Sequence, residues 1–253
     1  MPDAPAPGGD PFAALRRATP ARVGLGRVGQ GLPTAPMLAF QLAHARARDA
    51  VHAELDVERV RAALGGSSLV VHAAAPDRAA YLADPDLGRR LDDGSPVLPR
   101  GDFDLALVVA DGLSATAVHA HAAAVISALI ARLPDWTLAP VVIARQGRVA
   151  IGDPIGAALG ARAVVVLIGE RPGLSAADSL GAYITWDPKP GRRDSERNCV
   201  SNIRPPGGLS PDQAADKIAW LLGEARRLGF TGVDLKDREA LADGPVTSRL
   251  GPA

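Results

Sequence analysis

The sequence predicts an α/β fold, an open and mostly parallel sheet with helices on both faces, preceded by a small helical N-terminal region. Apolar runs alternate with stretches of helical periodicity from residue 68 to residue 228. Several runs are apolar at every position, which is typical of parallel strands covered on both faces. The 253 residues, 47% of them apolar, are enough to fill a large core.

Three regions follow from the composition along the chain. Residues 1–20 are dense in Pro, Gly and Ala, and we interpret them as a flexible tail with one short helix at Phe12–Arg17. Residues 21–66 are interpreted as the helical region, which two adjacent glycines end. Residues 67–253 are interpreted as the α/β domain.

Within the helical region, a helix is predicted to begin near Thr34, a plausible N-cap that Pro36 follows closely. Apolar and small side chains then recur at steps of three and four, which places them on one helix face. These residues are Met37, Phe40, His44, Ala47, Val51 and Leu55.

Five apolar runs of the α/β domain are predicted to be strands. They are residues 68–75, 103–110, 139–144, 161–169 and 181–186. Helices are predicted between runs and after the last one; two of them open on Ser114 and on Ser210, and Gly229 ends the second. Right-handed crossovers between such strands would give a Rossmann-like sheet.

Ligands of an open parallel sheet sit beyond the carboxyl ends of its strands. Two loops fall there, "ADGLS" (110–114) and "GERPGLS" (169–175), although such strings are also ordinary strand-to-helix turns. The string "GLGRVG" (24–29) has the glycine spacing of a dinucleotide site. No clear strand precedes it and the helix begins several residues later, so we interpret it as a glycine-rich turn.

The charge balance argues against a nucleic acid or an anionic membrane as the partner. Lys plus Arg and Asp plus Glu each number 28, so the chain has no concentrated positive field. One cysteine cannot form an internal disulfide, and no apolar run reaches the roughly 18 residues that cross a bilayer. The histidine spacing forms no metal site, so the metal prediction is none. A cytoplasmic protein is the simplest interpretation.

The only cysteine, Cys199, lies in "SERNCVSNIRPPGG" (195–208) between two arginines. Arg197 and Arg204 could lower the thiol pKa, as a nucleophile requires. No histidine lies near it in the chain to act as a base, and Asn198 and Asn202 offer donors and acceptors instead. A ligand-holding loop of irregular backbone is the favoured interpretation, while a Cys199-dependent hydrolase stays open.

Long strings of the chain resemble one known family. "LIGERPGLSAADSLGAYITW" (167–186) and "DSERNCVSNIRPPGGLSPDQAADKIAWLLGEARRLGFTGVDLKD" (194–237) are similar to the small subunit of ethanolamine ammonia-lyase. "ARVGLGRVG" (21–29), "ADGLSATAV" (110–118) and "GRVAIGDPIG" (147–156) also resemble that family and occur in the right order.

The resemblance implies a two-subunit lyase that converts ethanolamine to acetaldehyde and ammonia by an adenosylcobalamin-initiated radical mechanism. A large barrel subunit would hold the substrate, and this chain would close over the corrin from the other side. Carried onto matching positions, the cobalamin contacts would be Val149, Glu170 and Cys199, with no catalytic residue in this chain. The family's metabolic role also implies packaging in a bacterial microcompartment, which the sequence leaves open.

From the residues alone, two other functions stay open. One is a stand-alone nucleotide-binding α/β module whose loops at 110–114 and 169–175 grip a phosphate. The other is the hydrolase that would use Cys199 as its nucleophile.

Overall fold

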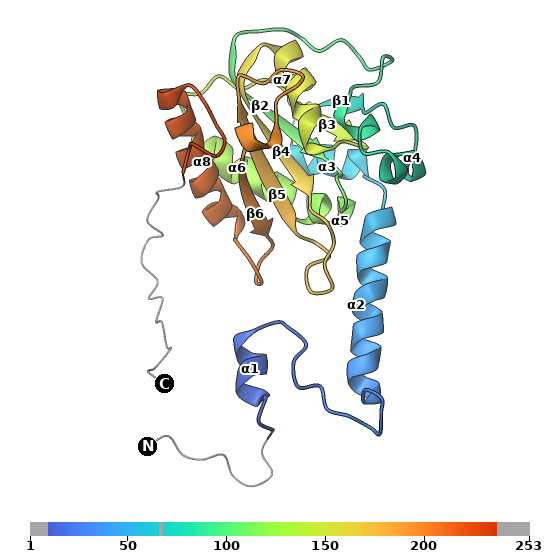
Figure 1. Ribbon diagram of the computed structural model, residues 1–253. Helices are drawn as coiled ribbons and strands as arrows, with labels where there is room; N and C mark the ends of the chain where they lie inside the picture. The colour runs from blue at the N-terminus through green and yellow to red at the C-terminus, as the bar shows by residue number, and fades with distance from the viewer. Residues whose placement is uncertain (1–9, 66–67, 237–253) are drawn as a thin grey trace, which may run out of the picture.

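The computed structural model describes residues 10–65 and 68–236, and their central feature is a six-stranded sheet with helices on both faces (Figure 1). The strand order is β1-β3-β2-β4-β5-β6. The strands are β1 (Ser68–His72), β2 (Phe103–Ala110), β3 (Val141–Arg145), β4 (Ala161–Gly169), β5 (Leu180–Trp186) and β6 (Asn198–Ile203). The α-helices are α1 (Ala13–Ala18), α2 (Thr34–His52), α3 (Val57–Leu64), α4 (Arg78–Ala83), α5 (Ala115–Ala117), α6 (Ala123–Ala131), α7 (Gly152–Leu159) and α8 (Pro211–Leu228). Four shorter helical segments are η1 (Leu87–Arg89), the π-helix η2 (Val118–Ala122), η3 (Val149–Ile151) and η4 (Asp194–Glu196).

Four of the strands, β1, β3, β2 and β4, are parallel. In β2 every residue after Phe103 is buried, and in β4 only Arg162 is exposed. The continuous apolar runs therefore form strands covered on both faces, as the sequence predicts. All five predicted strands exist, with ends that differ by a few residues.

The prediction of a mostly parallel, Rossmann-like sheet is not confirmed, because the sheet is mixed. Strand β5 runs antiparallel to β4, and β6 runs antiparallel to β5. The chain between β4 and β5 contains no helix. A parallel connection needs a crossover of a dozen or more residues, whereas a short loop can only reverse the chain.

Apolar cores lie on both faces of the sheet. On one face α3, the continuous helix α5–η2–α6 and α8 pack against the strands. On the other face α7 and η3 pack against side chains of the opposite parity in β2 and β4. The predicted stripe of the helix after Ser114 is buried; it consists of Val118, Ala122, Val125, Leu129 and Leu133.

The predicted helix ends are confirmed where the chain supplies capping residues. The hydroxyl of Ser114 accepts a hydrogen bond from the N–H of Ala117, and Ser210 forms a capping box with Gln213. Gly229 ends α8 in the left-handed conformation, with φ +79°. These caps satisfy backbone groups that a helix terminus otherwise leaves without partners.

The N-terminal segment forms helices but not the predicted apolar face. Helix α2 begins and ends close to the expected positions, but Thr34 is its first residue and not, as predicted, its N-cap, which is Pro33. Met37, Phe40 and His44 are exposed. The glycines of "GLGRVG" adopt positive φ and form a turn before α2, as interpreted from the sequence. Residues 1–9, 66–67 and 237–253 lie outside the described residues, so the boundaries 1–20, 21–66 and 67–253 stay predictions.

Candidate functional site

A cavity of about 460 Å3 opens at the carboxyl edge of the parallel strands. It lies where β2 and β4 end and η3 begins, the edge at which ligands of parallel sheets bind. Two of the three residues carried over from the family, Val149 and Glu170, line it. The lining is Tyr81, Gly112, Leu113, Arg148, Val149, Ile168, Gly169, Glu170, Arg171 and Tyr183. We call it the edge pocket.

Two glycines of the edge pocket allow its backbone segments to approach closely. Gly112 has φ +56°, and a β-carbon there would overlap the carbonyl oxygen of Gly169. A β-carbon at Gly169 would overlap the carbonyl oxygens of Ser114 and Asp111. Any side chain at these positions would push the loop at 110–114 away from the end of β4.

Hydrogen bonds fix the carboxylate of Glu170 at the end of β4. Its Oε2 accepts from the hydroxyl of Ser179 at 2.5 Å and from the N–H of Asn202 at 3.3 Å. Its Oε1 lies so close to Gly181 that a β-carbon there would be 2.9 Å away. The carboxylate is therefore held over β5 and β6 rather than free in solvent.

Cys199 lies on β6, so the predicted irregular loop is wrong at this position. It pairs with Tyr183 of the neighbouring strand, and Tyr183 itself lines the edge pocket. Cys199 is exposed on β6, but partial desolvation of the thiol raises its pKa; a hydrogen bond with Tyr183 opposes this, and the carboxylate of Glu170 raises the pKa further. Burial also raises the pKa of Tyr183, and the neighbouring Cys199 and Glu170 raise it further.

The expected effect of the two flanking arginines on Cys199 is not found, because both have other partners. Arg197 forms two hydrogen bonds of 2.7 Å to Asp153, and each of these side chains is only 2% exposed. Arg204 pairs with Asp178 at 2.9 Å. No arginine lowers the thiol pKa, so the structure does not provide an activated nucleophile at Cys199.

The buried pair Arg197–Asp153 links two elements of the site. Asp153 lies in the first turn of α7, four residues after Val149, and Arg197 lies two residues before Cys199. Arg197 also donates to the hydroxyl of Thr185 at 2.8 Å. This contact therefore sets how the segment with Val149 lies relative to β6.

Sequence reasoning missed a charged cluster beneath the edge pocket. Asp111, 2% exposed, accepts hydrogen bonds from the N–H groups of Gly112, Gln146 and Gly147 at 3.0–3.1 Å. Burial raises the pKa of Asp111, while Arg78 at 3.6 Å opposes this. The signal was present in "ADGLS", where an acidic residue ends an apolar strand.

Tyr81 lies between two arginines in the same cluster. The guanidinium carbons of Arg78 and Arg148 lie 4.6 and 4.2 Å from the centre of its ring. Within the described residues, Nη2 of Arg78 and Nε of Arg148 are buried without a hydrogen-bond partner. Arg148 lines the edge pocket, so a ligand there would meet a cation as well as apolar walls.

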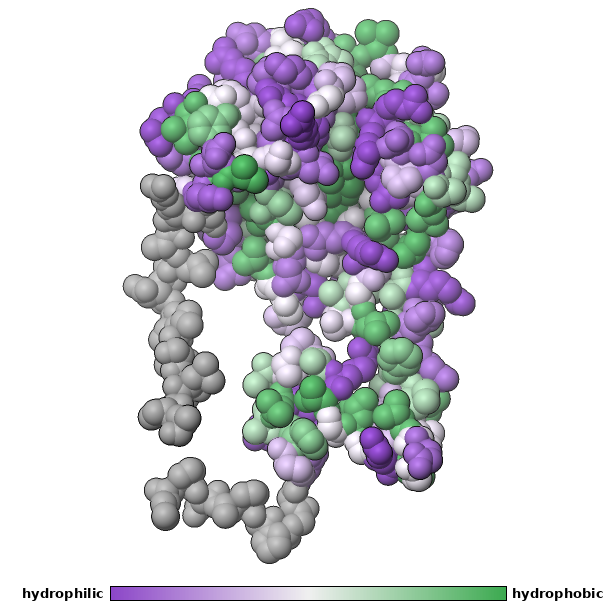
Figure 2. Space-filling model, viewed as in Figure 1, coloured by the Kyte–Doolittle hydropathy of each residue, from purple (hydrophilic) through white to green (hydrophobic). Residues whose placement is uncertain are grey.

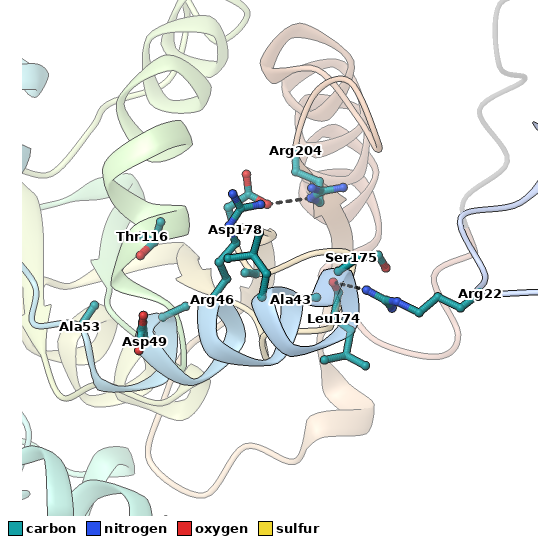
Figure 3. Close-up of a pocket in the computed structure, with 14 residues that line it drawn as sticks. Arg22, Ala43, Arg46, Asp49, Ala53, Thr116, Leu174, Ser175, Asp178 and Arg204 are labelled. Atoms are coloured by element: carbon teal, nitrogen blue, oxygen red, sulfur yellow. Dashed lines mark hydrogen bonds and ion pairs between the residues drawn. The ribbon is translucent and has the colours of Figure 1, made fainter. Parts of the chain in front are cut away.

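A second cavity, of about 790 Å3, lies between α2 and the loop that joins β4 to β5 (Figure 3). The Arg204–Asp178 pair borders it, and Nη2 of Arg22 donates to the carbonyl of Leu174 at 3.4 Å. Figure 3 shows Arg46 extending from α2 toward Asp178. The loop after β4 therefore borders both cavities.

Metal and membrane sites find no support among residues 10–65 and 68–236. No group of three or more His, Cys, Asp or Glu side chains there could hold a metal ion. His119 instead accepts a hydrogen bond from the N–H of Asp56 at 2.9 Å. Within the same residues, no helix combines the length and apolar character needed to span a bilayer.

Comparisons with known proteins agree with the resemblance. The model of the ethanolamine ammonia-lyase light chain family matches residues 9–236. A protein of Bradyrhizobium diazoefficiens named ethanolamine ammonia-lyase small subunit is 57% identical, over 91% of this chain and 92% of its own length. Proteins of the same name from Xanthomonas campestris and Azotobacter vinelandii are 53% and 50% identical, covering 94% and 96% of this chain and 90% and 96% of their own lengths. The chain therefore belongs to the ethanolamine ammonia-lyase light chain family.

Proposed function

We propose that this chain forms one wall of an adenosylcobalamin site in an ethanolamine ammonia-lyase and that a large subunit completes the site and holds ethanolamine. One observation carries the proposal. Val149 and Glu170, from separate elements, line the same edge pocket, and Tyr183 between β4 and β6 joins that lining to Cys199. Cys199 itself does not line the edge pocket; it pairs with Tyr183, which in turn pairs with Val166, three residues before the end of β4.

The residues of the edge pocket fit a corrin. A corrin is a broad apolar ring with amide side chains at its rim, so it needs an apolar wall and hydrogen-bonding groups around it. Val149, Leu113 and Ile168 supply apolar surface, while Glu170 and Arg148 supply an acceptor and a donor. The cavity of about 460 Å3 is smaller than the whole cofactor, which supports a site shared with a partner.

The chain's own residues would bind, orient and exclude water. Val149 would contact the ring, the fixed carboxylate of Glu170 would accept from a corrin amide, and Cys199 would contact the ring edge through a protonated thiol. Adenosylcobalamin, when bound, would supply the radical chemistry of the reaction. No side chain of this chain needs to touch ethanolamine, so we assign no catalytic residue here.

The Cys199-dependent hydrolase has no specific observation in its favour. A hydrolase needs an activated thiol with a base, whereas the pKa of Cys199 is raised and no histidine lines the edge pocket.

A cytoplasmic location, with packaging in a bacterial microcompartment, is part of the proposal and is supported by the family alone.

Ammonia release tests the proposal. The chain, a large subunit of the family and their mixture are each incubated with adenosylcobalamin and ethanolamine, and ammonia and acetaldehyde are measured. We expect product from the mixture only. Product from this chain alone, or a mixture that forms the complex but stays inactive with adenosylcobalamin, contradicts the proposal.

A further inference from the structure

The segment from Asp10 to His52, which we call the N-terminal arm, is poorly covered by the rest of the chain. Its helix α2 has 19 residues, and the only buried one is Ala50, two residues from its end. Figure 1 shows α2 extending away from the sheet and α1 lying apart from the body. Within residues 10–65 and 68–236, few hydrogen bonds connect arm and body: Arg78 donates to the carbonyl of Val51 at 2.7 Å, and Arg22 donates to the carbonyl of Leu174.

The N-terminal arm carries most of the exposed large apolar side chains. Of fourteen such side chains among the described residues, eight lie in the arm. They are Phe12, Leu15, Val28, Leu32, Met37, Leu38, Phe40 and Leu42. Figure 2 shows apolar residues gathered over this part of the molecule. Exposed apolar patches of this kind mark surfaces that bind another protein.

The apolar residues of α2 point in several directions. Met37, Leu38, Phe40 and Leu42 span less than two turns, and only Leu42 borders the cavity facing the body. The first ten residues of α2, Thr34–Ala43, contain no charged side chain, and none of them is buried. Apolar side chains on several sides of a helix are normally covered by other protein, so we infer that a second molecule covers them.

The charge of the N-terminal arm indicates what kind of molecule covers it. It contains six arginines and two aspartates, a formal charge of +4 in a chain of net charge zero. Two arms of two copies would place like charges together, which disfavours a homodimer at this surface. An apolar surface with an acidic rim on a different protein would complement it.

The position of the N-terminal arm indicates which partner protein binds it. Figure 1 shows it on the side of the sheet where the loop after β4 emerges, and that loop borders the edge pocket. A protein that covers the edge pocket would therefore also reach the arm.

We propose that the N-terminal arm is the docking element for the large subunit, which seats Met37, Leu38 and their apolar neighbours in an acidic-rimmed groove. This inference rests on the proposed function for the identity of the partner. It adds which surface of this chain makes the contact.

The test uses full-length chains and measures association with the large subunit by sedimentation velocity, without cobalamin. The double variant Met37→Glu, Leu38→Glu places charge at the fourth and fifth residues of α2, near its N-terminus, where Glu is favourable to a helix. We expect binding to weaken about 30-fold or more, the effect of losing a central interface contact. The single variant Leu38→Ala, which adds no charge, should weaken it in the same direction. Wild-type association should also slow as salt rises.

The matched control is Val97→Glu. Val97 is 98% exposed and belongs to the body rather than the arm, so it adds a surface charge elsewhere. This variant should bind as wild type does, and circular dichroism should show all variants folded.

If both arm variants bind the large subunit as tightly as wild type does, the docking proposal is wrong. It is also wrong if the arm mediates dimerisation of this chain and the substitutions leave binding to the large subunit unchanged. Ammonia release is measured separately on the wild-type complex. A complex that forms through the arm but releases no ammonia contradicts the proposed function instead.

Discussion

Helices α2 and α8 have nearly equal lengths but opposite environments. In α8, 18 residues long, six residues are buried; in α2, 19 residues long, one is buried. Both helices carry apolar residues at steps of three and four. Periodicity therefore predicts that a helix forms, whereas its burial depends on a surface that must exist elsewhere. The body supplies that surface for α8, and on our proposal a second subunit supplies it for α2.

The largest expected loss of stability in the body, the chain outside the N-terminal arm, comes from breaking its buried ion pair. Arg197→Met leaves Asp153 buried without its partner, and we expect a loss of about 3–5 kcal/mol in the free energy of unfolding. Arg227→Met, which removes an exposed pair with Glu224, should change it by less than about 1 kcal/mol. Denaturant unfolding measures both. Equal small losses would show that Arg197 does not hold α7 against β6.

A truncation in each helix tests the comparison directly. Leu222→Ala in α8 removes a fully buried side chain and should destabilise the isolated chain by about 2–5 kcal/mol. Leu38→Ala in α2 removes a side chain that is 58% exposed and should change stability by about 0.5 kcal/mol or less. Both stability changes are measured from the shift in the midpoint of denaturant unfolding, provided that the m-value is unchanged. A comparable loss in the two variants would mean that the body covers the arm in solution.

The edge pocket lies in the body, whose helices are covered within the chain itself. We therefore expect the carboxylate of Glu170 to be in place before the large subunit binds. Glu170→Gln keeps the shape but removes the charge, and we expect the complex to bind adenosylcobalamin about tenfold more weakly. Equilibrium dialysis with visible spectra measures this. Glu224→Gln on α8, far from the pocket, is the control and should bind normally. Unchanged affinity in the Glu170 variant removes that residue from the site.

The smallest expected effect concerns the thiol of Cys199, which pairs with the pocket residue Tyr183. A thiol with a raised pKa stays protonated to higher pH, so Cys199 should react with iodoacetamide at a higher pH than the unfolded chain, whose thiol pKa is about 8.5. For the same reason, ionisation of Cys199 favours the unfolded state, and stability should fall as pH rises above that value. Mass spectrometry across a pH series measures the alkylation. A folded-state pKa below the unfolded one contradicts the environment described here.

Alkylation also reports on the pocket when cobalamin is present. Bound cobalamin should protect Cys199 from iodoacetamide, and prior alkylation should weaken cobalamin binding. A complex that keeps full affinity and activity after complete alkylation would exclude Cys199 from the corrin contact.

Much of the fold could be predicted from the sequence, because continuous apolar runs and capping serines are local signals. The antiparallel β5 and β6 could not be, since strand direction depends on whether the connecting loop crosses the sheet. Strand β6 was missed because only Val200 and Ile203 of its side chains are buried. Its exposed positions are Cys199, Ser201 and Asn202, so the sequence shows neither an apolar run nor strict alternation there and resembles a loop.

The candidate site was predictable only in part. Val149, Glu170 and Cys199 came from the resemblance, and nothing in periodicity or spacing selects them. Asp111, Arg78 and Arg148 form a cluster through contacts between segments more than thirty residues apart. Such contacts arise from the order of the strands in the sheet, which the sequence does not state.

A structure of the complex of this chain with its large subunit and adenosylcobalamin would be decisive. We predict a corrin in contact with Val149, Glu170 and Cys199 at the carboxyl edge of the sheet. A corrin bound away from all three residues would contradict the shared site.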